Sequence, residues 1–158
     1  PAVLFGGTGY DSANQDMPDS LPERYEMGTS NIAGIAGLNA ALQWSQEIGL
    51  QIIFEHEQQN RKKLLDILSQ YDFVGNSPEQ QYVGIVSCLF EGISSDVAGN
   101  LLSKQGVSVR TGLHCAPLAH KFLGTYPAGT IRFSVGYFAS EDDYKALVEA
   151  LDYIEQAI

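Results

Sequence analysis

A thiol, an imidazole and a guanidinium group lie together in one short segment of the sequence. Residues 110–117 read Arg-Thr-Gly-Leu-His-Cys-Ala-Pro, so Cys115 directly follows His114 and stands five residues after Arg110. The glycine and the proline predict a loop, where side chains are accessible. Positive neighbours favour the thiolate, which is the nucleophilic form of cysteine. These residues alone leave two interpretations open, a reactive thiol and a half-buried structural cysteine.

The second cysteine, Cys88, has different neighbours. It lies in an apolar run beside Leu89 and Phe90 that predicts a β-strand, so we expect it to pack in the core. Two cysteines in such unlike surroundings do not form a disulfide scaffold. The sequence therefore predicts a reduced, cytoplasmic protein.

A zinc site is an alternative use of His114, Cys115 and His120. Zinc normally takes four ligands, and the remaining histidine, His56, falls in a polar predicted helix far along the chain. A fourth ligand at the usual spacing is absent from the sequence. We therefore expect no metal.

An arginine interrupts another apolar run. Arg132 stands between Ile131 and Phe133 in a predicted strand over 130–135. Such a side chain either extends to solvent from the exposed face or points into a cleft and holds an anion. The run alone favours the first interpretation.

Two glycine-containing segments stand near the beginning of the sequence. Residues 6–9 read Gly-Gly-Thr-Gly, and Gly28 and Thr29 precede Ser30, Asn31 and a predicted helix. With Thr29 or Ser30 as the N-cap, the free N–H groups and a hydroxyl would suit a phosphate, although a simple capped helix explains the same residues. Neither segment has the spacing of a P-loop or of a dinucleotide-binding fold.

Changes in hydrophobic period predict the elements that position these residues. Short β-runs alternate with helices after residue 71, whereas the first 49 residues are rich in loops and lead into a helix. The final helix has a clear start, with Ser140 as the cap and Asp143 three residues later. The predicted helices are 31–48, 50–70, 95–105 and a last one that follows Ser140, and the predicted strands are 72–74, 83–90, 107–109 and 130–135.

The composition excludes several classes of protein. Of the 158 residues, 44% are hydrophobic and 18% are charged, so disorder and a membrane span are both excluded. Nine Lys and Arg against nineteen Asp and Glu give a net charge of −10, which repels a nucleic-acid backbone. We expect a globular α/β protein without a nucleic-acid or membrane partner.

Taken in order, these segments resemble the C-terminal part of class V aminotransferase-fold enzymes that depend on pyridoxal phosphate. Cysteine desulfurases and selenocysteine lyases are the most similar, because the run Arg-x-Gly-x-His-Cys-Ala at 110–116 is typical of desulfurases. The resemblance implies an α/β fold, the fold type I of pyridoxal-phosphate-dependent transferases. It implies a remnant of the large cofactor-binding lobe at 1–49, a connector helix at 50–71 and a complete small α+β lobe at 72–158.

The resemblance also assigns roles to particular residues. Cys115 would take sulfur from L-cysteine as a persulfide and release alanine, with His114 as its orienting partner. Arg132, with Arg110 at the mouth of the site, would bind the substrate carboxylate. Gly28 and Thr29 would bind the cofactor phosphate of the partner subunit across a homodimer interface, and a sulfur-acceptor protein is a further expected partner.

The lysine that carries the cofactor in this family belongs to a segment before the Gly-Gly-Thr-Gly loop. His120-Lys121 has the familiar dipeptide but follows the thiol segment, so we do not assign it this role. We therefore expect the 158 residues alone to be inactive. Two alternatives stay open: another class V aminotransferase or lyase in which Cys115 is a bystander, and a cofactor-free thiol protein that relays sulfur.

Overall fold

The computed structural model describes residues 3–7, 9, 11, 13–71, 73–74 and 83–157. Thr8 of the glycine-rich segment and Asp72 of the first expected strand lie outside these residues. The chain divides into two compact units, Pro1–Ile48 and Gly49–Ile158. Within the described residues, no helix is both long and apolar enough to cross a membrane. The assignment of lobes and a connector to residues 1–49, 50–71 and 72–158 stays a prediction.

The first unit contains the 3-10 helix η1 (Glu23–Tyr25) and the helix α1 (Ile32–Ile48). The N–H of Gly28, a residue with φ +72°, donates to the carbonyl of Gly7. The expected cap was wrong: the side chain of Asn31, not that of Thr29 or Ser30, accepts from the N–H of Gly34 at 3.0 Å. Because α1 begins at Ile32, only Asn31 is placed to bond the third helical N–H.

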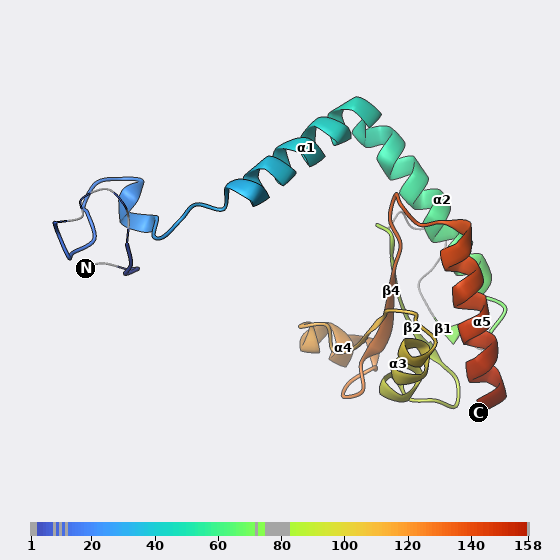
Figure 1. The fold of residues 1–158 in the computed structure, drawn as a ribbon. Coiled ribbons are helices and arrows are strands. Elements are labelled where there is room, and N and C mark those ends of the chain that lie inside the picture. Colours follow the sequence, from blue (N-terminus) through green and yellow to red (C-terminus); the bar gives the residue numbers. More distant parts are fainter. Residues whose placement is uncertain are drawn as a thin grey trace. The chain divides into compact units, whose positions relative to one another are not determined.

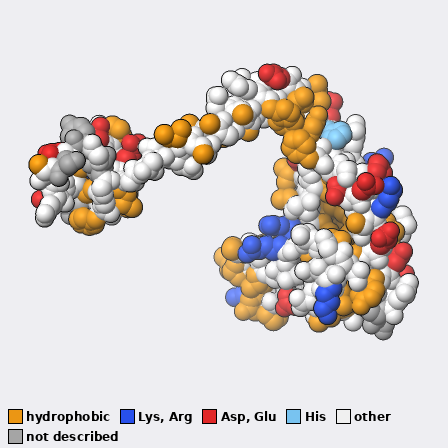
Figure 2. Space-filling model, viewed as in Figure 1, with side chains coloured by type: hydrophobic (Ala, Val, Ile, Leu, Met, Phe, Trp, Pro, Cys, Tyr) orange, Lys and Arg blue, Asp and Glu red, His pale blue; other side chains and the backbone are white. Residues whose placement is uncertain are grey.

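Helix α1 has no buried residue in this unit. Large apolar side chains at a spacing of three or four are more than half exposed along it, and Figure 2 shows such side chains over this helix. The expected apolar face is therefore present but uncovered in the described residues. These exposed side chains are Ile32, Ile35, Leu38 and Leu42.

The second unit is a sheet covered on one face by helices (Figure 1). Neighbouring strands are antiparallel and follow the order β1-β2-β4-β3. The elements, in chain order, are α2 (Leu50–Leu68), β1 (Phe73–Val74), β2 (Ile85–Phe90), α3 (Ser95–Lys104), β3 (Arg110–Gly112), α4 (Pro117–Leu123), β4 (Thr130–Ser134) and α5 (Glu141–Ala157).

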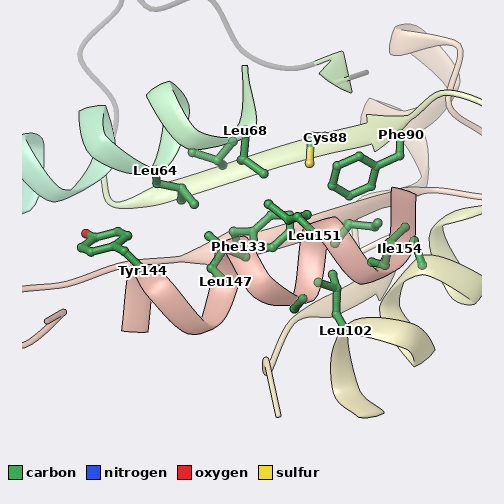
Figure 3. Close-up of a cluster of buried hydrophobic side chains, with 14 residues drawn as sticks. Leu64, Leu68, Cys88, Phe90, Leu102, Phe133, Tyr144, Leu147, Leu151 and Ile154 are labelled. Atoms are coloured by element: carbon green, nitrogen blue, oxygen red, sulfur yellow. The ribbon is translucent and has the colours of Figure 1, made fainter. Parts of the chain in front are cut away.

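Apolar side chains from β2 and β4 meet those of α2, α3 and α5 in one core (Figure 3). Leu64, Leu102, Ile131 and Leu151 are almost fully buried there. Cys88 is only 1% exposed, and burial raises the pKa of its thiol to about 12. The prediction that Cys88 is a core residue is confirmed.

The strand predicted at 107–109 was wrong. The strand lies at Arg110–Gly112, inside the segment expected to be a loop, and it pairs with β4. The position of this strand is set by tertiary contacts. Gly112, the last residue of β3, pairs with Thr130, and the adjacent Gly129 allows the two chain segments to approach closely. A Cβ at Gly129, whose φ is +75°, would lie 2.1 Å from the backbone of Gly112. Helix α4 was also not predicted from the sequence.

The start of α5 is the expected capping box. The Ser140 hydroxyl accepts from the N–H of Asp143 at 3.4 Å, and the Asp143 carboxylate accepts from the N–H of Ser140 at 2.8 Å. We predict that Ser140→Ala lowers the free energy of unfolding by about 1 kcal/mol, because one helical N–H loses its acceptor. Urea titration of both proteins measures this, and an unchanged midpoint would contradict the assigned cap.

Candidate thiol and anion-binding site

Two arginines stand opposite one another on neighbouring strands. Arg110 of β3 pairs with Arg132 of β4, and Ser87 of β2 is the partner of Arg132 on its other side. Because Ile131 and Phe133 are buried in the core, Arg132 points to the opposite face of the sheet. Directly opposed side chains share a face, and like charges there destabilise each other. An anion bound at this face would remove that repulsion.

Arg132 is half-buried rather than freely solvated. Its Nε atom is buried and has no hydrogen-bond partner within the described residues. A buried guanidinium nitrogen without an acceptor is costly, and a carboxylate is the acceptor that best matches its planar donor geometry. This geometry favours the interpretation of Arg132 as an anion ligand over that of a surface side chain.

The exposed thiol of Cys115 lies at the centre of a tight turn. The N–H of Ala116 donates to the carbonyl of Leu113 at 2.8 Å, and the two central residues, His114 and Cys115, have φ of +48° and +62°. Positive φ in a residue with a Cβ costs about 1–2 kcal/mol. Strain of this kind is frequent at functional sites, where the surroundings must hold it in place.

The imidazole of His114 is tied to the start of β4. Its Nε2 atom lies 3.1 Å from both the carbonyl oxygen and the Oγ1 of Thr130. A carbonyl can only accept, so this contact assigns the proton to Nε2 and leaves Nδ1 as an acceptor. That Nδ1 is buried and has no partner within the described residues. Burial and the nearby Arg132 charge lower the pKa of His114, so the ring is neutral near pH 7.

A second histidine packs against the first. The ring centroids of His120 and His114 are 5.8 Å apart, and Nδ1 of His120 lies 2.7 Å from the Oγ1 of Thr125. His120 is buried and lies in the last turn of α4. In the described part of the chain, no group of three or more His, Cys, Asp or Glu side chains could hold a metal ion.

The second unit thus brings together four of the six predicted site residues. Arg110, His114, Cys115 and Arg132 gather at β3, β4 and the turn that follows β3. Gly28 and Thr29 belong to the first unit. Thr130 could not be found from the sequence, because a threonine at the start of a strand carries no sign that a histidine will be hydrogen-bonded to it.

The lowered pKa of His114 predicts a pH dependence of stability. In the unfolded chain His114 takes up a proton as the pH falls through about 6.5, whereas in the folded chain it stays neutral to a lower pH. The unfolded state therefore binds more protons in that interval, and stability falls with decreasing pH. We predict that lowering the pH from 7.5 to 5.5 reduces the free energy of unfolding less in His114→Asn than in the unmodified protein. Equal losses in urea midpoint would contradict this.

Two solved cysteine desulfurases are similar in structure to this chain. The apo cysteine desulfurase of Thermococcus onnurineus matches 99% of this chain with a TM-score of 0.74 and 26% identity, and this chain covers 40% of it. The cysteine desulfurase CsdA of Escherichia coli, in an S-sulfonic acid form, matches 87% with a TM-score of 0.71 and 28% identity, and 34% of it is covered. The fold is accordingly part of the α/β fold of type I transferases.

The family follows from the sequence comparison. The model of the aminotransferase class-V family matches residues 1–147, so the chain belongs to this family. The cysteine desulfurase of Synechococcus elongatus is 34% identical over 85% of this chain, and a probable cysteine desulfurase of Methanothermobacter thermautotrophicus is 33% identical over 98% of it. The chain spans 21% and 40% of the length of these two relatives.

Proposed function

We propose that this chain is the part of a cysteine desulfurase that accepts sulfur and binds the substrate carboxylate. One observation carries the proposal: the exposed thiol of Cys115 lies in the turn that directly follows the strand that places Arg110 opposite Arg132. A thiol beside an anion-binding pair suits a substrate that carries both a sulfur atom and a carboxylate. L-cysteine has both groups, and the similar proteins are named cysteine desulfurases.

Arg132 binds the substrate carboxylate in this proposal. In this proposal the terminal nitrogens of its planar guanidinium group form two parallel hydrogen bonds to the two carboxylate oxygens. Arg110 adds a second positive charge on the same face and steers the anion toward the site. Repulsion between the two guanidinium groups is relieved when the carboxylate arrives, which adds to the affinity.

Cys115 is the sulfur acceptor. Its thiolate forms a bond to the substrate sulfur while the bond from that sulfur to the substrate carbon breaks. The electron pair of the broken bond stays with the carbon skeleton, which takes a proton and leaves as alanine. Cys115 keeps the transferred sulfur as a persulfide. His114, held by Thr130, orients the turn that carries this thiol.

The residues present fit the phosphate of pyridoxal phosphate. Thr29 and Ser30 are exposed and precede the first turn of α1. Gly28, which precedes them, has a positive φ. Hydroxyl and amide donors at a helix N-terminus form a phosphate-binding set. The Thr29 hydroxyl would hold the cofactor phosphate from across a homodimer interface, and Gly28, whose N–H donates to Gly7, would shape the loop that places Thr29. When bound, the cofactor withdraws electrons from the substrate and so makes the carbon–sulfur bond breakable.

The lysine for the cofactor does not come from these residues in our proposal. Lys63 and Lys145 pair with acidic side chains, and Lys121 lies over the ring of Tyr126 at 5.1 Å. All five lysines of the sequence fall between residues 62 and 145, after the phosphate segment. The 158 residues alone should therefore form no alanine, and a longer protein that contains them should be active.

Transfer of ³⁵S from labelled cysteine tests the proposal. In the longer protein supplied with pyridoxal phosphate, we expect label on Cys115 and one alanine for each sulfur transferred. The label should leave with dithiothreitol and pass to an added acceptor protein. Release of alanine without label on Cys115 would point to a class V enzyme in which this thiol is a bystander. Label on Cys115 in the absence of the cofactor would support a sulfur-relay protein.

A further inference from the structure

The turn at 113–116 needs contacts with the rest of the fold to hold its conformation, because its two central residues have positive φ although neither is glycine. The Ala116 to Leu113 hydrogen bond closes the turn but does not fix its direction. The side chain of Cys115 is exposed and offers no anchor. The side chain of His114 is the anchor, because its Nε2 reaches two oxygens of a single residue, Thr130.

Thr130 is itself firmly placed. It is 7% exposed, it is the first residue of β4, and it pairs with Gly112, the last residue of β3. Gly129 beside it approaches Gly112 so closely that no Cβ fits between them. Thr130 therefore stands at the base of the turn, where neither strand can shift without breaking the pairing.

Thr130 also lies on the same strand as Arg132, the proposed carboxylate ligand. Thr130 and Arg132 are two residues apart on β4, so their side chains project from the same face of the sheet. The hydrogen bond that His114 donates to Thr130 thus connects the turn that carries Cys115 with the strand that carries Arg132.

We propose that Thr130 is a positioning residue that acts through His114 and sets the place of the Cys115 thiol relative to Arg132. Its hydroxyl and its carbonyl together fix the direction of the imidazole, and the imidazole fixes the strained turn. The importance of this placement rests on the proposed function, in which the thiol and Arg132 act on one substrate.

Two alkylating reagents of similar size measure the placement without any turnover. Iodoacetamide is neutral, whereas iodoacetate carries a carboxylate that Arg110 and Arg132 attract. Both react with the thiolate by forming a sulfur–carbon bond and releasing iodide. The rate constant for iodoacetate is divided by that for iodoacetamide, and this ratio is then divided by the same ratio for free cysteine. A normalised ratio above one reports positive charge near the thiol. Cys88 does not interfere, because it is buried.

We expect this normalised ratio to be about fivefold above unity for the unmodified chain and to fall about threefold in Thr130→Val. Thr130→Ser keeps the hydroxyl and should restore the ratio. Thr125→Val is the matched control, because it removes a hydroxyl that bonds His120 instead of His114. The control should leave the ratio unchanged, and circular dichroism of each variant identifies any that fails to fold.

A double-mutant cycle decides whether Thr130 acts through His114. His114→Asn removes the anchor, and asparagine tolerates positive φ. If the proposal holds, the double variant with Thr130→Val has the ratio of His114→Asn alone. Independent, additive effects, or an unchanged ratio in folded Thr130→Val, would overturn it. Because alkylation needs neither cofactor nor cysteine as substrate, these outcomes are separate from failure of the desulfurase proposal.

Discussion

Replacing Cys115 with alanine should abolish persulfide formation and lower the rate of alanine release by roughly 10³-fold or more in the longer, cofactor-loaded protein. The thiolate is the only acceptor for sulfur in our proposal, so its loss removes the chemical step and not substrate binding. Alanine keeps a Cβ at the positive φ of residue 115, so the strain in the turn stays the same. Alanine formation under steady-state and single-turnover conditions measures the effect.

Cys88→Ala is the matched control for this prediction. It removes the other thiol of the chain, which is 1% exposed in the core, and should cost stability but leave turnover within about twofold. Full turnover by Cys115→Ala would exclude a persulfide on this residue. The enzyme would then be a class V lyase or aminotransferase in which Cys115 takes no part.

Arg132→Gln should lower kcat/KM for L-cysteine by about 10²- to 10³-fold, because two hydrogen bonds to a charged carboxylate are lost. Most of the loss should be in KM if the guanidinium binds substrate and transition state alike. Arg132→Lys should be intermediate, since it keeps the charge but loses the planar pair of donors. Steady-state kinetics with cysteine as the varied substrate separates KM from kcat.

Cysteine methyl ester supplies the control for this second prediction. The ester has no carboxylate charge, so Arg132→Gln and the unmodified protein should use it equally poorly. Lys145→Gln removes a positive charge from an exposed pair with Asp142 and should change kcat/KM for cysteine by less than about twofold. If Arg132→Gln lost activity equally toward cysteine and its ester, Arg132 would not be the carboxylate ligand.

Most helices of this protein, though not α4, and most strands could be predicted because their signals are local. The apolar stripe of α5, with Ser140 and Asp143 at its start, needs no information from elsewhere in the chain. The strand at 107–109 was mispredicted because Val107 and Val109 have the right propensity but pair with no strand among the residues that the structure describes. The residues that do pair, Arg110–Gly112, are polar and glycine-containing, and only their fit against β4 makes them a strand.

The sequence by itself determined the apolar stripe and capping box of α5, the core position of Cys88 and the motif residues Cys115, His114 and Arg132, since residue type and spacing carry these features. Only the tertiary structure decided that Arg110 opposes Arg132 and that Thr130 holds His114. Arg110 and Arg132 are far apart in sequence and meet through strand register, which depends on the packing of both strands into one core. The segment 110–117 therefore acts in the fold as a strand and a strained turn.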